Sequence, residues 1–176
     1  VHHLLPVWSH FGNENWCMIG YHAVPVIADA WINGIRGFDG KHALDACLAS
    51  ATHRSYGNLG DYMDLGYVPY ESNVVGSSMT LEYAYDDWTI AQLAKALGEN
   101  GIAETFEKRS GNWKNLFNDK TGFVGAKDKA GNWKTPFDPM HTANEGFIEG
   151  NAWNYSLYVP QDVSTLIQKM GGNKRF

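Results

Sequence analysis

Three short strings in the sequence each combine a carboxylate with a tryptophan and with an amide or tyrosine side chain. Carboxylates can exchange protons with a substrate, and aromatic faces beside polar groups suit sugars, which present C–H patches ringed by hydroxyls. No string is specific by spacing alone, since a solvated helix face also explains a single carboxylate and a lone histidine is commonly structural. The candidates are Glu14 and His22 in the string 12–22, Glu82, Asp86 and Asp87 in 80–88, and Glu149, Asn151 and Trp153 in 149–155.

The composition narrows the classes of protein to consider. The chain has 176 residues, 44% of them hydrophobic, which is enough for a sizeable core. No stretch approaches the roughly 18 uninterrupted apolar residues of a membrane-spanning helix. The net charge is −5 and no run of Lys or Arg occurs, which argues against nucleic acid as the main partner. Aromatic residues reach 14%, which fits a carbohydrate site, although a single aromatic side chain more often fills a core.

The cysteines and histidines do not indicate a metal centre. Cys17 and Cys47 are too few for a disulfide scaffold, and we predict that both are buried thiols. The histidines lack the spacing of a zinc motif, so we assign no metal ligand in this chain.

Apolar residues recur with helical spacing over most of the chain, which predicts a mainly all-α fold. Short links join the predicted helices in three pairs, and long irregular stretches separate the pairs. The predicted helices cover 17–31, 39–54, 79–97, 102–117, 147–158 and 160–171, the long stretches cover 55–78 and 118–146, and a small β-hairpin is predicted over 122–134.

This alternation of short and long connections predicts where a site would form. When consecutive helices run antiparallel and short links alternate with long loops, all short links lie at one end of the helices and all long loops at the other. Long loops are uncommon unless they are functional. We therefore expect 13–22, 77–82 and 145–151 to converge at the long-loop end. Three helical hairpins fit a partial (α/α)₆ barrel with a small β-hairpin insertion, and a compact helical domain without toroidal symmetry remains an alternative.

Five longer runs, 12–30, 80–88, 112–117, 136–139 and 149–153, can be compared with known families. Together they resemble glycoside hydrolase family 92, the calcium-dependent exo-acting α-mannosidases, over essentially the whole chain. That family places an N-terminal β-sandwich before an (α/α)₆ catalytic domain and hydrolyses terminal α-mannosides with inversion. The resemblance implies that 1–176 is a single segment, the first half of the catalytic domain, with the β-sandwich and the C-terminal half of the barrel absent.

The resemblance also implies residue roles. The Glu-Gly-Asn-Ala-Trp motif makes Glu149 the general acid, and we take the other polar groups of the converging strings as candidate substrate-binding residues. The family's base carboxylates lie in a later Gly-Asn-x-Asp-x-Gly-Gln-Met-Ser-Ala-Trp motif that these residues do not contain. Calcium is the implied cofactor, with its ligands expected outside this chain. The candidate substrate-binding residues are Glu14, His22, Glu82, Asn151 and Trp153.

A general acid must stay protonated near neutral pH until it donates its proton. The predicted helix N-terminus opposes this at Glu149, because the helix dipole favours the anion by about 0.3–1 kcal/mol. Burial beside Phe147 and Trp153, together with a nearby second carboxylate, would have to outweigh that effect. A second carboxylate, roughly 6.5–9.5 Å away, would activate the water in an inverting mechanism.

The resemblance thus implies part of a secreted or periplasmic hydrolase that removes terminal mannose, α-1,2-linked, from a mannose-containing glycan. The segment alone is expected to be inactive, because it has an acid and no base, and exposed apolar helix faces would favour its self-association. Two alternatives stay open: a non-catalytic carbohydrate-binding or interaction module, and another (α/α)₆ carbohydrate-active enzyme such as a glycoside phosphorylase.

Overall fold

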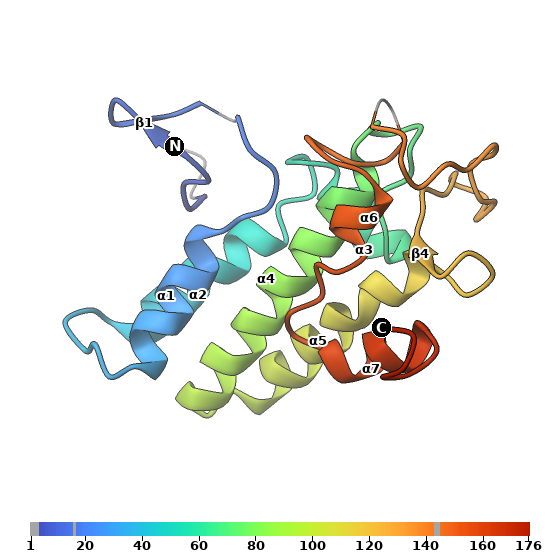
Figure 1. Cartoon of the computed structure of the whole chain (residues 1–176). Helices are drawn as coiled ribbons and strands as arrows, with labels where there is room; N and C mark the ends of the chain where they lie inside the picture. Colours follow the sequence, from blue (N-terminus) through green and yellow to red (C-terminus); the bar gives the residue numbers. More distant parts are fainter. Residues whose placement is uncertain (1–3, 16, 143–144) are drawn as a thin grey trace. The chain divides into compact units, whose positions relative to one another are not determined.

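Helices are the main elements of the computed structural model, which describes residues 4–15, 17–142 and 145–176 (Figure 1). The mainly helical fold class predicted from the periodicity is therefore confirmed. The chain divides into two compact units, Val1–Gly60 with Glu82–Gly111 and Asp61–Leu81 with Asn112–Phe176. Among the described residues, no helix is both long and apolar enough to cross a membrane.

The first unit contains two helical hairpins. Helices α1 (Ala23–Ile32) and α2 (Gly40–Ala51) form one, and most of α4 (Gly76–Leu97) pairs with α5 (Asn100–Ser110) in the other. The Asp39 side chain caps α2 by accepting hydrogen bonds from the backbone N–H groups of Lys41 and His42, at 2.9 and 3.1 Å. The core of this unit includes small, aliphatic and aromatic side chains on its helices: Val24, Ala28, Leu44, Cys47, Ile90, Ala91, Ala94 and Phe106.

The second unit is less regular. It contains most of α3 (Leu59–Leu65), the first turn and a half of α4 and nearly all of the 3₁₀ helix η1 (Gly111–Leu116). It also contains the short helices α6 (Ala152–Tyr155) and α7 (Val163–Lys169). Strands β3 (Phe117–Asn118) and β4 (Phe123–Val124) pair antiparallel. Its core contains Trp113, Leu116, Val124, Phe147, Val159 and Leu166.

Two serines in the first turn of α4 hold the loops of the second unit. The Ser77 hydroxyl donates to the Gly125 carbonyl at 3.2 Å, and the Ser78 hydroxyl accepts from the Ile148 N–H at 3.0 Å. Gly146 has a φ of +100°, and a Cβ there would lie 2.5 Å from the Ser77 hydroxyl oxygen. The segment that leads to Glu149 is therefore fixed against α4 by backbone and side-chain contacts.

Several predicted helices have different bounds in the structure. The helix predicted over 17–31 begins only at Ala23, because Gly20 has a left-handed φ of +82° that interrupts a helix. The helix predicted over 102–117 ends at Ser110 and continues as η1. The helix predicted over 147–158 is wrong over most of its length, because Glu149 has a φ of +50° and Asn151 is extended, so only the single turn α6 forms.

The predicted hairpin over 122–134 is correct only in part. A turn at 128–131 brings Lys127 opposite Trp133 in a single antiparallel bridge, but β4 pairs with β3. Sequence reasoning missed α3, which lies inside the long stretch 55–78, and the hairpin of β1 (Ser9–His10) and β2 (Asn13–Glu14).

The two cysteines have different environments. Cys47 is buried as predicted, and burial raises the pKa of its thiol to about 12. Cys17 is exposed, so the prediction of a second buried thiol is wrong. The reason is that Cys17 lies in the irregular segment before α1 and not on a packed helix face.

Candidate active site

A histidine lies between two carboxylates in the first unit. Glu82 and Asp86 are one helical turn apart on α4 and so share a face of that helix. The Nδ1 atom of His22 lies 2.7 Å from a carboxylate oxygen of Asp86, and its Nε2 atom contacts a carboxylate oxygen of Glu82. His22 and Glu82, which end two of the three segments expected to converge, are thus in contact, and their role in binding a substrate stays a prediction.

The backbone at Gly20 makes room for the imidazole ring. Its φ of +82° is a left-handed conformation that favours glycine. A Cβ at this position would lie 2.5 Å from the Nε2 atom of His22 and under 3.0 Å from two ring carbons. Any larger residue at position 20 would therefore displace the ring from its two carboxylates.

The charges of this cluster follow from its hydrogen bonds. Burial by itself lowers the pKa of His22, but the hydrogen bonds and charges of Asp86 and Glu82 outweigh burial and raise it to about 10. Complete burial raises the pKa of Asp86 even though the His22 contact opposes that shift. We place a proton on His22 at neutral pH, because two acceptors flank its ring and the Tyr21 N–H also donates to Asp86 at 2.8 Å.

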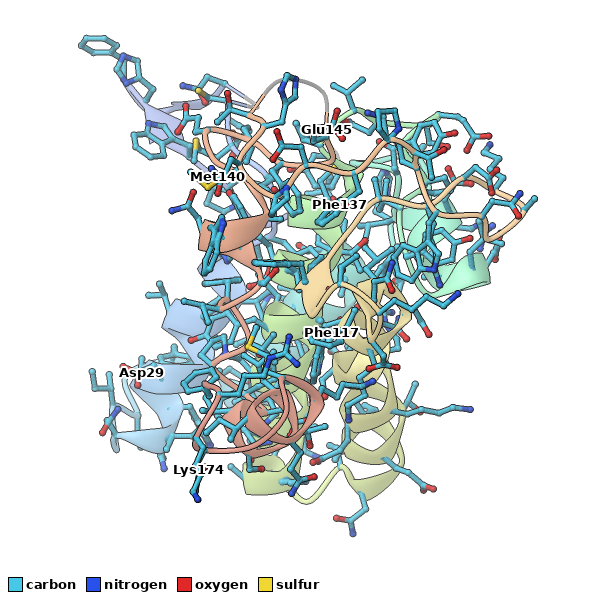
Figure 2. All side chains as sticks on the ribbon, turned by 45° about the vertical axis from the view of Figure 1, so that its right-hand side comes forward. Asp29, Phe117, Phe137, Met140, Glu145 and Lys174 are labelled. Atoms are coloured by element: carbon cyan, nitrogen blue, oxygen red, sulfur yellow. The ribbon has the colours of Figure 1, made fainter. Side chains whose placement is uncertain are left out.

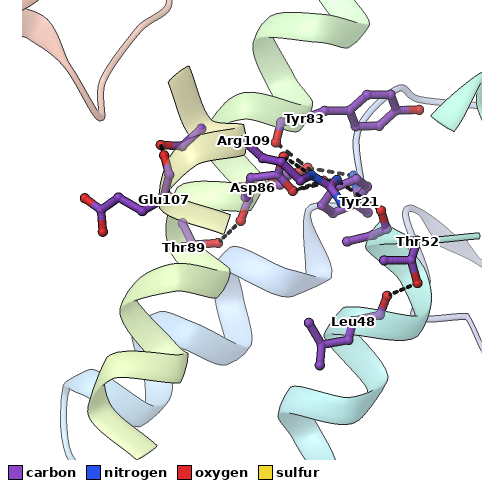
Figure 3. A network of polar contacts seen from close by, with 11 residues as sticks. Tyr21, Leu48, Thr52, Tyr83, Asp86, Thr89, Glu107 and Arg109 are labelled. Atoms are coloured by element: carbon purple, nitrogen blue, oxygen red, sulfur yellow. Dashed lines mark hydrogen bonds and ion pairs between the residues drawn. The ribbon is translucent and has the colours of Figure 1, made fainter. Parts of the chain in front are cut away.

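The neighbouring carboxylate, Asp87, belongs to a structural ion pair. Arg109 donates to both oxygens of Asp87 at 3.0 Å, and the Tyr21 hydroxyl donates to one of them at 2.6 Å. Figure 3 shows Tyr21, Asp86 and Arg109 close together in this network. Asp87 is fully buried, and a buried carboxylate needs this compensation. Its role is to hold α4 against α5 and the segment before α1.

Glu14 has its described contacts in the N-terminal hairpin. Its carboxylate accepts hydrogen bonds from the backbone N–H groups of Val7 and Trp8. Burial, and then the charge of Glu14, raise the pKa of Tyr56 to about 12, and the Tyr56 hydroxyl donates to the Gly20 carbonyl at 3.5 Å. The charge of Glu14 thus acts on Tyr56, which is hydrogen-bonded to the segment that carries His22. The substrate-binding role of Glu14 stays a prediction.

Glu149 lies in the second unit on an exposed, strained piece of backbone. Its φ of +50° is uncommon for a residue other than glycine, asparagine or aspartate. The prediction that Phe147 and Trp153 bury this carboxylate is not met within this chain, since Glu149 is exposed, Trp153 is 54% exposed and only Phe147 is buried. The opposing helix dipole is also weaker than predicted, because α6 is a single turn that begins after Glu149.

Asn151 caps that turn. Its side chain accepts from the N–H groups of Trp153 and Asn154, the Asn154 side chain accepts from the Asn151 N–H, and the Asn151 amide donates to the Met140 carbonyl at 3.3 Å. Met140 and Glu145 lie in the irregular segment that leads to α6 (Figure 2). The structure thus gives Asn151 a positioning function for the segment that carries Glu149, and contact with a substrate stays a prediction.

Trp153 lines a cavity that the sequence did not reveal. The Trp153 ring meets the edge of Phe123 with 4.9 Å between centroids. The cavity has a volume of about 310 Å³ and is lined by Thr121, Gly122, Phe123, Trp153, Ser156, Leu157, Met170, Arg175 and Phe176. That volume is at the lower end of the roughly 300–1,000 Å³ typical of small-molecule sites.

The described residues do not fit a bound metal ion. Within 4–15, 17–142 and 145–176, no group of three or more His, Cys, Asp or Glu side chains is placed to hold one. Calcium prefers six to eight oxygen ligands, usually with carboxylates among them, and the described residues show no such acidic cluster. The calcium site, and the convergence of all three strings, stay predictions.

Residues 1–176 match the catalytic domain of a family of glycosyl hydrolases. The chain belongs to glycosyl hydrolase family 92. The chain is also similar to a protein of Arthroderma benhamiae named as an uncharacterized secreted glycosidase, with 30% identity over 196 residues covering 89% of this chain.

Solved structures of the family resemble this chain closely. A family GH92 α-mannosidase from Bacteroides thetaiotaomicron has 42% identity over 97% of this chain and a TM-score of 0.93, and that enzyme has also been solved in complex with mannoimidazole. A family GH92 inverting mannosidase from the same bacterium has 35% identity over 97% of the chain and a TM-score of 0.91. The chain spans only about a quarter of these relatives, namely 23%, 24% and, for the fungal protein, 25% of their lengths.

Proposed function

We propose that the protein to which these residues belong is a glycoside hydrolase that removes terminal α-linked mannose, α-1,2-linked, from glycans with inversion of configuration. The observation that carries this proposal is the 42% identity and TM-score of 0.93 with a GH92 α-mannosidase over 97% of the chain. The inverting relative and the mannoimidazole complex support the stereochemistry and the sugar. The secreted fungal relative supports a secreted or periplasmic location.

Glu149 is the general acid in this proposal. Among the described residues no cation pairs with its carboxylate, which leaves the side chain available for proton transfer. Glu149 would donate its proton to the departing glycosidic oxygen. A second carboxylate roughly 6.5–9.5 Å away, from the family motif that these residues do not contain, would activate the water on the opposite face of the sugar.

This mechanism requires two features that the described residues do not supply, namely burial of the general acid and ligands for calcium. Glu149 is exposed here, so the burial that keeps a carboxylic acid protonated has to come from parts of the domain beyond this chain. Calcium, implied by the family, would likewise find its ligands there, because the described residues offer no cluster for it.

Replacing Glu149 by glutamine in the complete enzyme tests the acid role. Glu149→Gln is expected to lower turnover of a mannoside with a poor leaving group by about 10²–10⁴-fold, which is the usual contribution of a general acid. An aryl mannoside with a good leaving group needs little protonation and should lose much less. Mannoimidazole binding should persist, which calorimetry measures.

Glu145→Gln is the matched control, because Glu145 lies in the same segment and pairs with Lys134 at 2.8 Å. It should leave turnover of both mannosides nearly unchanged. Normal turnover of the poor-leaving-group substrate by Glu149→Gln would defeat the assignment.

Product analysis separates the proposal from the alternatives. Proton NMR of the first product should show β-mannose, formed without phosphate. Formation of a mannose 1-phosphate in phosphate buffer would identify a phosphorylase, and binding of mannosides without any turnover would identify a binding module.

A further inference from the structure

The cluster around His22 contains two carboxylates, one more than would balance the single positive charge of a protonated imidazole. Asp86, which is fully buried, already supplies one carboxylate at 2.7 Å from the imidazole. Glu82 supplies a second to the other ring nitrogen. With His22 protonated, the three side chains have a net charge of about one negative unit, in a partly buried place where that charge needs hydrogen-bond donors.

The three side chains differ in exposure, with Asp86 fully buried, Glu82 mostly buried and His22 35% exposed, so Asp86 is the buried end of the cluster. The Asp86 side chain is 0% exposed and accepts from the Tyr21 N–H as well as contacting His22. The Glu82 side chain is 15% exposed, and one of its oxygens contacts His22. The other Glu82 oxygen has no recorded partner within the part of the chain that the structure describes.

The ring between them has little freedom to move. Gly20 lies so close that a Cβ would collide with three ring atoms, and each ring nitrogen has its own carboxylate. An imidazole held in this way also holds the Glu82 carboxylate that it contacts. In the same way, the hydrogen-bond partner of a metal-bound or catalytic histidine fixes the orientation of that histidine.

We propose that Asp86 and His22 are positioning residues that hold the Glu82 carboxylate, and that Glu82 accepts a hydrogen bond from a hydroxyl of the sugar substrate. This inference rests on the proposed function, since it takes the substrate to be a mannoside. It adds Asp86 to the functional residues, and it separates Glu82, which contacts the sugar, from His22, which acts through Glu82.

The first test uses Glu82→Gln in the complete enzyme, with methyl α-mannoside as the probe in isothermal titration calorimetry. Gln can still accept the His22 hydrogen bond, but its other terminal atom is then an NH₂ group that cannot accept from a hydroxyl. We expect affinity to fall by about 10- to 100-fold, as for loss of a hydrogen bond to a charged group. The melting temperature should also fall, because Glu82 helps to stabilise protonated His22, so the titration is carried out well below it.

Glu107→Gln is the matched control, because Glu107 is a half-exposed carboxylate of α5 that pairs with Lys95. It should leave the affinity unchanged. Unchanged affinity in Glu82→Gln, in an enzyme whose wild type hydrolyses α-mannosides, overturns the inference and leaves the proposed function intact. Failure of the wild type to act on or bind mannosides refutes the proposed function itself.

Two substitutions of His22 separate positioning from simple stabilisation. His22→Asn keeps a donor near the position of Nδ1, toward Asp86, and His22→Gln keeps one near the position of Nε2, toward Glu82. A positioning role predicts that His22→Asn raises KM more than His22→Gln does, at similar melting temperatures. If the two variants differ only in melting temperature and not in KM, His22 is a structural residue and the inference is wrong.

Discussion

At the scale of single residues, two neighbouring buried carboxylates of α4 are paired with two different kinds of cation. Asp87 is paired with Arg109, a cation at any ordinary pH. Asp86 is paired with His22, a cation only while its ring holds a second proton. Neighbouring aspartates thus differ in how strongly pH affects the contact that each one makes.

We expect the stability of the complete protein to fall as pH rises from about 6.5 to about 10. The pKa of His22 is raised from 6.5 to about 10 in the folded state, so the folded state binds more protons than the unfolded state in this interval. The stabilisation by His22 is fully present below pH 6.5 and is lost as pH approaches 10. The raised pKa of Asp86 acts in the same direction at lower pH.

Thermal unfolding of the wild type and of His22→Gln between pH 6 and pH 10 measures this effect. The difference in melting temperature between the two proteins should shrink steadily as the pH increases. A difference that is constant across the interval would show that His22 is not charged in the folded state.

Some of the candidate residues could be placed from the sequence, because residue spacing along a helix determines which side chains share a face. The spacing of Glu82 and Asp86 predicts that they share a helix face, and the structure agrees. The contact of His22 with both was not predictable, because it depends on the left-handed backbone at Gly20, and no periodicity signals that conformation.

At the scale of elements, side-chain caps mark where two of the helices begin, α2 and α6. Asp39 caps the three-turn helix α2, and Asn151 with Asn154 forms a capping box on α6. The apolar pattern over 147–158 was real, but it arises from buried residues of an irregular segment, so a helical spacing was not enough to predict a helix. Periodicity reports which side chains are buried and not the backbone that buries them.

Removing the cap of α2 should destabilise the protein by a predictable amount. Asp39→Ala leaves the N–H groups of Lys41 and His42 without their side-chain acceptor, at a cost of about 1 kcal/mol in the free energy of unfolding. Urea denaturation of the complete protein measures this. Asp45→Ala, at an exposed position in the middle of α2, is the control and should change stability by less than about 0.5 kcal/mol. Equal effects of the two substitutions would contradict the capping role.

At the scale of the whole molecule, this chain contains about a quarter of the length of its relatives. It supplies a candidate acid and candidate sugar-binding groups, and its described residues supply no metal site. The fold class was predictable because helical periodicity extends over most of the sequence. The short strands and α3 were not predictable, because two-residue strands and a seven-residue helix leave too little pattern.

The isolated chain of 176 residues is expected to release no mannose from α-mannosides, even with calcium added. The reason is that an inverting hydrolysis needs two carboxylates on opposite sides of the sugar, and the base motif of the family is not among these residues. Chromatography of the reaction products is the measurement. Calcium-dependent release of mannose by this chain alone would mean that the chain contains its own base.

The left-handed backbone at Glu149 has a consequence for protein engineering. A designer who ranked substitutions by heat tolerance would choose glycine or asparagine at this position, because either residue adopts that conformation at lower cost. In the proposed mechanism the same change would remove the proton donor. Position 149 is therefore one that a stabilising redesign of this protein should leave untouched.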